Sequence, residues 1–256
     1  MTVRIEKRPG AERGSRTPEK IQSLSSGAIG TVTGAVKDAA GGAIRAVKPR
    51  LRGWIHAFTA PLALAACIVL TVLAPGPALT WACAAYLACS LFLFANSGVY
   101  HISYGHWPRR VTAVLQRVDH ANIYLLIAGT YTPLSVALLD RGTTLLVLGI
   151  VWGGALAGII TSLAWRSAPR WLTTLFYILL GWVAIWFLPQ FWMSGGPAIV
   201  WLIIAGGVVY TVGGAIYARR WPDPDPRWFG FHEIFHTCTV AAWACQCTAC
   251  YLAVLG

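Results

Sequence analysis

The feature that most constrains the fold of this chain is a series of seven apolar stretches that begins shortly after Arg52. Each stretch is close to the roughly 20 residues that an α-helix needs to cross the hydrocarbon core of a bilayer. The connections between them are short and rich in Pro, Gly or Arg. The sequence therefore predicts an all-α membrane protein, folded as a seven-transmembrane helical bundle. The predicted spans cover residues 56–73, 78–101, 118–139, 143–165, 171–191, 198–217 and 232–255.

Composition supports this class and excludes a soluble enzyme. Only 11% of the residues are charged and 57% are hydrophobic, whereas soluble domains carry about 25% charged residues. The 13 Trp and nine Tyr residues suit the aromatic belts that form at membrane–water boundaries. We therefore expect a multi-pass protein of the cell (plasma) membrane. Its expected partner is a membrane lipid and not a nucleic acid, and its oligomeric state is left open.

Cationic residues are divided very unevenly between the two sides of the predicted bundle. The chain through Arg52 carries eleven Lys and Arg, and the loops on the same side carry eight more. The loops on the other side carry Arg141 alone. Because Lys and Arg are enriched in cytoplasmic loops, we predict a cytoplasmic N-terminus and a C-terminus outside.

The chain divides by composition into two parts. Residues 1–50 are basic and hold a cluster of glycines between positions 27 and 42. We predict that they form a flexible or amphipathic cytoplasmic tail that contacts anionic lipid headgroups. Residues 51–256 are the predicted seven-helix membrane domain.

Ionisable residues gather near the predicted cytoplasmic ends of the spans. His232 and His236 are four residues apart and share one helix face, as do Ser97 and His101, while Asp119 opens the third span. Ionisable groups inside a membrane are costly and indicate a functional site. We predict that His101, His232 and His236 bind one Zn²⁺ ion and leave one coordination position open, which is typical of catalytic zinc.

Two further residues are predicted to be catalytic. Zinc lowers the pKa of a coordinated water from 15.7 to about 7. Asp119 is the predicted acceptor of that water's proton, or the residue that orients the water. Ser97 lies one helical turn before His101 and is expected to hydrogen-bond the same water or a substrate oxygen.

Other interpretations of these residues stay open. His56 and His120 are expected to be structural. The sequence His232-Glu233-x-x-His236 also matches the zincin motif, in which the Glu is the general base. No histidine follows His236, and Glu233 is displaced around the helix and has other possible partners. An intramembrane metalloprotease is therefore only a minor alternative.

The seven cysteines lie within apolar stretches and not in polar loops. Cys247 and Cys250 form a C-x-x-C pair just after Cys245, but no second pair completes a four-thiolate site. We expect these residues to pack between helices. The role of this cluster is left open.

Several motifs resemble those of the haemolysin III family, the bacterial branch of the progestin and adipoQ receptor group, in a superfamily that includes alkaline ceramidases. The resemblance covers residues 49–256. It rests on Arg52-Gly53-x-x-His56, Ser97-x-x-x-His101, Asp119-His120-Ala121-Asn122-Ile123, Ala128-Gly129-Thr130-Tyr131-Thr132-Pro133 and Phe231-His232-Glu233-Ile234-Phe235-His236. The resemblance implies seven helices with a cytoplasmic N-terminus and a zinc ion held by three histidines. It also implies a water-holding aspartate at Asp119 and a nearby serine at Ser97.

The residues and the resemblance together favour a zinc-dependent hydrolase of a membrane-lipid amide or ester, similar to a ceramidase and involved in membrane-lipid homeostasis. The alternative is a receptor-like lipid sensor in which zinc is structural. A pore-forming cytolysin is less favoured because no predicted span carries a continuous polar stripe. The sequence does not identify the lipid, and whether the protein is an enzyme is left open.

Overall fold

The computed structural model describes residues 49–165 and 169–256, and all regular elements in these ranges are helical. The prediction of an all-α protein is therefore confirmed. The elements in chain order are α2 (Trp54–Leu73), α3 (Gly76–Ile102), α4 (Arg109–Leu138), α5 (Arg141–Ala164), α6 (Arg170–Gly181), the 3-10 helix η1 (Trp182–Phe187), α7 (Leu188–Arg219) and α8 (Phe231–Leu255). The predicted tail falls almost wholly outside the described residues and stays a prediction.

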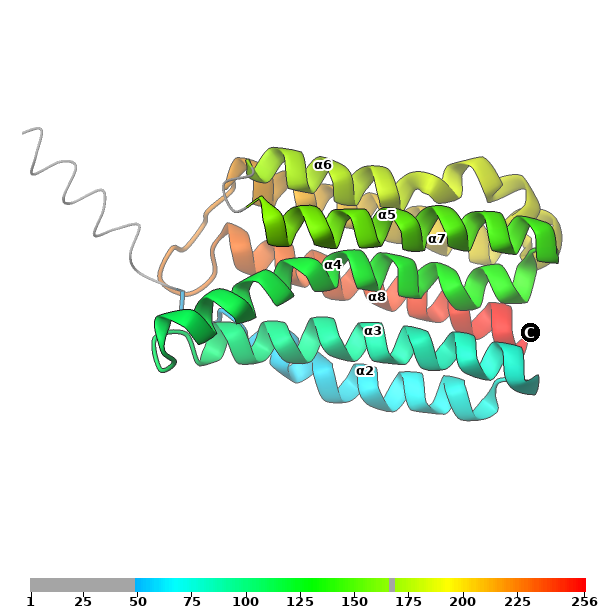
Figure 1. The fold of residues 1–256 in the computed structure, drawn as a ribbon, viewed down its shortest axis with the longest axis horizontal. Coiled ribbons are helices and arrows are strands. Elements are labelled where there is room, and N and C mark those ends of the chain that lie inside the picture. The colour runs from blue at the N-terminus through cyan, green and yellow to red at the C-terminus, as the bar shows by residue number, and fades with distance from the viewer. Residues whose placement is uncertain (1–48, 166–168) are drawn as a thin grey trace, which may run out of the picture. The chain divides into compact units, whose positions relative to one another are not determined.

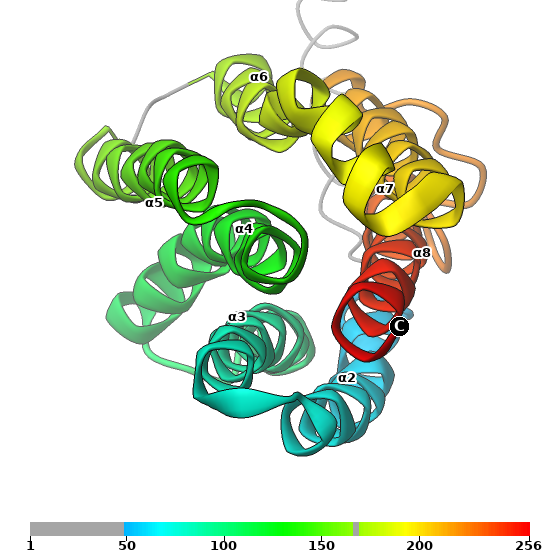
Figure 2. The same ribbon diagram turned by 90° about the vertical axis from the view of Figure 1, so that its right-hand side faces the viewer.

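The helices share one long axis and alternate in direction, so that neighbours in the sequence pack side by side (Figure 1). Viewed along that axis, they follow one another around a ring (Figure 2). Helix α8 closes this ring because it packs against both α7 and α2, and it also contacts α4. The end of α3 and the starts of α2, α4 and α8 consequently lie at the same end of the bundle (Figure 1).

In the part of the chain that the structure describes, six helical stretches are long and apolar enough to cross a membrane, which makes this a multi-pass membrane protein. Five of them are the single helices α2, α3, α4, α5 and α8, and the sixth is the 50-residue stretch Arg170–Arg219. Gly196 interrupts this stretch with non-helical backbone at φ 77° and ψ 178°, and the ribbon turns back within it (Figure 1). The fifth and sixth predicted spans lie on either side of Gly196. The count of seven spans and the orientation stay predictions.

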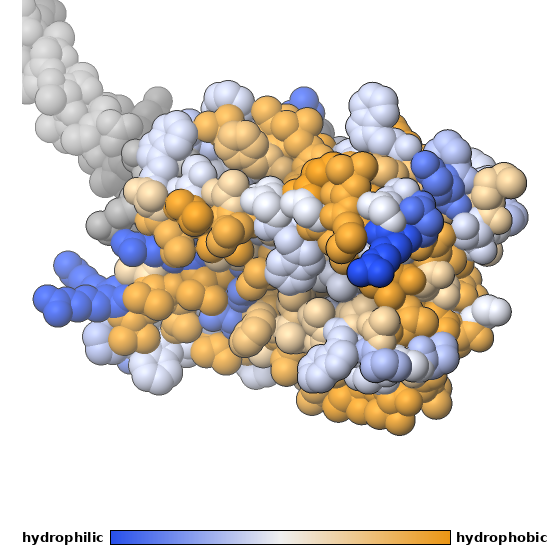
Figure 3. All heavy atoms as spheres, turned by 45° about the vertical axis from the view of Figure 1, so that its right-hand side comes forward, coloured by the Kyte–Doolittle hydropathy of each residue, from blue (hydrophilic) through white to orange (hydrophobic). Residues whose placement is uncertain are grey.

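The outer faces of the helices are strongly apolar. Trp186 is 80% exposed and Met193 is 85% exposed, and apolar side chains cover much of the flank seen in Figure 3. In contrast, Tyr86, Phe94 and Tyr124 are almost completely buried between the helices. Such an apolar surface suits the hydrocarbon core of a bilayer. Helices are also suited to it because they pair their backbone polar groups internally.

Two glycines allow α3 to approach its neighbours closely. A Cβ atom at Gly98 would lie 3.1 Å from the Cα of Ala57 in α2, and one at Gly129 in α4 would lie 2.6 Å from the Cβ of Cys89. Small residues at helix contacts are typical of membrane bundles, where they permit close backbone packing. The first contact holds α3 against α2 beside the polar end of the bundle, and the second holds α3 against α4 further along it.

Candidate metal centre

The start of α8 carries two of the predicted metal ligands, and several hydrogen bonds fix where that helix begins. The backbone N–H of Phe231 donates to Asp223 Oδ1 at 2.9 Å. The N–H of Gly230 donates to Glu233 Oε2, also at 2.9 Å. Both bonds satisfy amides that the first helical turn leaves without a partner. These bonds therefore fix the position of His232 and His236 along the axis of the bundle.

The structure brings the three predicted ligands together. One ring nitrogen from each of His101, His232 and His236 lies within 4.8 Å of the other two. The Nε2 atoms of His101 and His232 are 3.2 Å apart. His101 and His236 are buried, and His232 is partly buried. Residues from the end of α3 and the start of α8, far apart in the sequence, thus converge on one point.

This geometry fits a zinc ion. Zinc binds imidazole nitrogen at about 2.0–2.1 Å in a tetrahedral arrangement, which places two such nitrogens about 3.3 Å apart. The His101–His232 pair already has this separation, and the other pairs, at no more than 4.8 Å, must close by at most about 1.5 Å. His236 Nδ1 is buried without a hydrogen-bond partner. A cation that accepts imidazole lone pairs suits this cluster, while the identity of the metal stays a prediction.

Asp119 and Ser97, the predicted catalytic residues, lie at the same place. Asp119 Oδ2 is 3.6 Å from His101 Nε2. Both Asp119 and Ser97 line a small cavity together with His232 and His236, and Ser97 is only 2% exposed. The structure therefore puts a carboxylate and a hydroxyl beside the imidazole cluster. Their catalytic roles stay predictions.

His56 and His120, which were expected to be structural, also line this cavity. The ring of His56 stacks on that of His236, with centroids 3.8 Å apart and planes 12° from parallel. His120 Nε2 lies 3.3 Å from the hydroxyl of Tyr217. Tyr217 was not singled out in the sequence, where nothing separates it from the other aromatic residues of the predicted sixth span.

Glu233 does not take part in the histidine cluster. Its Oε1 atom accepts a hydrogen bond from Arg52 Nε at 2.8 Å, and its Oε2 accepts from Gly230. Its side chain is completely buried. Both carboxylate oxygens of Glu233 are hydrogen-bonded to groups other than the imidazoles. This arrangement favours a structural role for Glu233 over the role of general base that the zincin motif would give it.

The cysteine cluster offers no comparable ligand set. All seven cysteines are free thiols, and Cys67, Cys247 and Cys250 are buried. Within the described parts of the chain, the three histidines are the group of His, Cys, Asp and Glu side chains placed to share an ion. That the cysteines pack between helices stays a prediction.

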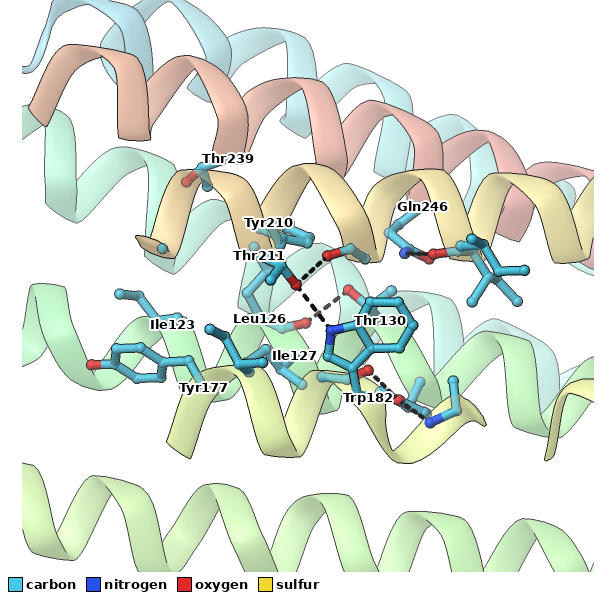
Figure 4. Close-up of a pocket in the computed structure, with 18 of the residues that line it drawn as sticks. Ile123, Leu126, Ile127, Thr130, Tyr177, Trp182, Tyr210, Thr211, Thr239 and Gln246 are labelled. Atoms are coloured by element: carbon cyan, nitrogen blue, oxygen red, sulfur yellow. Dashed lines mark hydrogen bonds between the residues drawn. The ribbon is translucent and has the colours of Figure 1, made fainter. Parts of the chain in front are cut away.

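A larger, apolar cavity adjoins the small one. It extends between α4, α6, α7 and α8, and Figure 4 shows Ile123, Leu126 and Ile127 on one of its walls. Some polar groups along it are paired within the wall, for example Trp182 Nε1, which donates to Thr211 Oγ1 at 2.9 Å. In contrast, the hydroxyls of Thr174 and Tyr210 are buried without a hydrogen-bond partner. The two cavities share the lining residues Leu93, Ile123, Tyr217, Phe235 and Thr239.

Comparison with known proteins gives a consistent result. The family described as haemolysin-III related matches residues 44–247. The hemolysin-3 homolog of Bacillus subtilis (strain 168) is 32% identical over 142 residues, which cover 55% of this chain and 65% of that protein. Hemolysin-3 of Bacillus cereus is 34% identical over 112 residues, which cover 44% of this chain and 51% of that protein. The matched regions thus span about half to two thirds of these relatives.

Proposed function

Because the chain belongs to the haemolysin-III-related family, we propose that it is a zinc-dependent hydrolase that cleaves an amide or ester of a membrane lipid. We place it in the cell (plasma) membrane, where such a reaction serves lipid homeostasis. The substrate reaches the site from the bilayer, and its headgroup stays at the end of the bundle where the histidines lie.

The observation that carries this proposal is the junction of two unlike cavities. The small cavity is lined by Asp119, Ser97 and imidazoles that include those of His232 and His236, and the large one is apolar. A membrane lipid has the same division, because a polar linkage joins its headgroup to an acyl chain. When the acyl chain of the lipid occupies the apolar cavity, its polar linkage lies beside the polar side chains, at the wall of Leu93, Ile123 and Phe235 that both cavities share.

The residues of the small cavity suit the steps of hydrolysis. His101, His232 and His236 would hold a zinc ion, which would supply a Lewis acid and lower the pKa of water at the site. Asp119, 3.6 Å from His101 Nε2, is positioned to accept the proton of the attacking water. Ser97 is positioned to donate a hydrogen bond to the carbonyl oxygen as negative charge develops on it. The apolar wall holds the acyl chain and excludes water from it.

Purified, zinc-loaded protein tests this function directly. We expect it to release fatty acid from at least one lipid in a library of amides and esters, measured by mass spectrometry. Asp119→Asn should slow that release by about 10²- to 10⁴-fold, because a positioned base contributes about this factor. The variant should still bind zinc.

Asp140→Asn is the matched control, because Asp140 caps α5 at the other end of the bundle. It should leave hydrolysis unchanged. A zinc-loaded protein that cleaves none of the lipids, or an Asp119→Asn variant with full activity, would contradict the proposal.

A receptor-like sensor is the second candidate, and one observation favours it. Helix α3 packs mainly on α2 and α4, whereas α8 packs on α7, α4 and α2. An ion bound by histidines of α3 and α8 would therefore add a link between two helices that are joined by side chains, such as Trp243 and Ser90, rather than by close backbone packing. In that case His232→Ala should lower the unfolding temperature sharply, and Asp119→Asn should change neither stability nor ligand response.

A further inference from the structure

The five residues Arg52–His56, here called the RGxxH segment, make three separate contacts with the histidine cluster and with Glu233 beside it. They lead into α2 and occupy the same end of the bundle as the cluster. The function proposed above assigns them no role. Each contact involves a different residue of the segment, and two of them reach a histidine of the cluster directly.

The first contact is the ion pair between Arg52 and Glu233. Arg52 Nε lies 2.8 Å from Glu233 Oε1, and the two side chains are 21% and 0% exposed. Glu233 follows His232 directly and precedes His236 by three residues. Its second carboxylate oxygen accepts from the N–H of Gly230. The ion pair thus ties the first turn of α8 to the chain that enters α2.

The second contact is the close approach of Gly53 to His101. A Cβ atom at Gly53 would lie 2.7 Å from the Cβ of His101 and 3.0 Å from the backbone nitrogen of Ile102. Gly53 also has φ +91°, a left-handed conformation that favours glycine. The segment therefore lies directly against the ligand that α3 provides.

The third contact is the stacking of His56 on His236. The two rings are nearly parallel, 3.8 Å apart, and His56 is 3% exposed. This stacking restricts the rotation of the His236 ring about its side-chain bonds. Through Arg52, Gly53 and His56, one short segment thus limits the movement of ligands on both α3 and α8.

We propose that the RGxxH segment sets the metal affinity of the three-histidine site, with the Arg52–Glu233 pair as the contact that locks α8 in register. Arg52 and Glu233 are positioning residues, because they act through His232 and His236. This inference rests on the metal binding included in the proposed function. The segment provides contacts outside the ligand set that orient the ligands, and such outer contacts commonly change the affinity of a metal site.

A role in positioning explains this pair better than a role in stability. Burying a charged pair costs desolvation that its attraction often fails to offset, so apolar replacements are commonly neutral or stabilising. The best-attested use of a buried ion pair is to fix the register of packed elements. Here the register in question is that of α8 against the start of α2, which decides where His232 and His236 lie.

The test is the zinc dissociation constant of the full chain in detergent, measured by competition with a chromophoric chelator. Arg52→Gln and Glu233→Gln remove one charge each. We expect either change to weaken zinc binding by about 10- to 100-fold, the usual effect of losing an outer contact to metal ligands. The double change Arg52→Gln/Glu233→Gln should cost about as much as one single change, because each already breaks the pair.

Cobalt provides a readout that a purely structural role would not change. The visible absorption of Co²⁺ reports its coordination geometry, and we expect the variants to alter this spectrum at saturating cobalt. Circular dichroism shows whether each variant is folded. If a single variant does not fold, Arg52→Leu/Glu233→Leu leaves no unpaired charge, and it should still show the weakened affinity.

Arg50→Gln is the matched control. Arg50 lies just before the segment, and its guanidinium stacks over Trp228 at 4.7 Å. Zinc binding should be unchanged in this variant. Folded pair variants that bind zinc as tightly as the original chain, with the same cobalt spectrum, would overturn the inference alone. An original chain that binds no zinc would overturn the proposed function and the inference with it.

Discussion

At the scale of single residues, position rather than residue type separates the roles of the histidines. His101, His232 and His236 offer nitrogen atoms to a common point, whereas His56 offers its ring face to His236. His120 faces the Tyr217 hydroxyl instead. His106 lies exposed in the loop between α3 and α4. Five imidazoles are thus in or beside the cluster, and three of them are placed as ligands.

The replacement His236→Ala tests this assignment. We expect the purified variant to lose its bound zinc in elemental analysis, because two remaining imidazoles give an incomplete ligand set. His106→Ala, which changes an exposed loop histidine, should retain the zinc content of the original chain. Equal zinc content in both variants would show that the ion binds elsewhere.

The sequence allowed the convergence of these residues to be predicted, but not the contacts around them. Helical spacing pairs His232 with His236, and the charge of the loops places His101 at the same end. In contrast, Arg52 and Glu233 are 181 positions apart, and their pairing depends on how α8 packs against α2. Nothing local in the sequence selects Arg52 over the other arginines as the partner.

At the scale of helices, the polar end of the bundle depends on the close packing of α3 and α4 further along their length. The approach of α3 and α4 at Gly129 leaves no room for a side chain, and Ser97 and His101 lie two to three turns further along α3 from Cys89. Lengths and small residues made the helices themselves predictable. The break at Gly196 falls in the connection between the predicted spans 171–191 and 198–217, whereas one 50-residue helical stretch that continues on both sides of it was not predicted.

Gly129→Ala tests the importance of this contact. The added methyl group would lie 2.6 Å from the Cβ of Cys89, so α3 and α4 must move apart. We expect a destabilisation of about 1–3 kcal/mol, which is usual for an overpacked contact, and a lower unfolding temperature in detergent. Gly149→Ala is the control, because a methyl group there meets nothing within 4 Å. Equal stability of the two variants would contradict the prediction.

At the scale of the whole molecule, the polar chemistry is concentrated at one end. The histidines, Asp119 and the Arg52–Glu233 pair lie where α3 ends and where α2, α4 and α8 begin. The cavity that leads away from them is apolar, which suits an acyl chain better than a column of water. Which face of the membrane this end occupies decides whether the site draws on cytoplasmic zinc and water.

Reporter fusions determine this orientation. Nineteen of the 20 Lys and Arg residues lie on the predicted cytoplasmic side, and cationic loops resist transfer across the membrane. We therefore expect alkaline phosphatase, which is active only outside, to be active when fused after Gly256. A green fluorescent protein fused at the same place should stay dark, whereas one fused after Arg220, between α7 and α8, should fluoresce. The reverse pattern would place the histidine cluster at the outer face and remove it from the cytoplasmic supply of zinc.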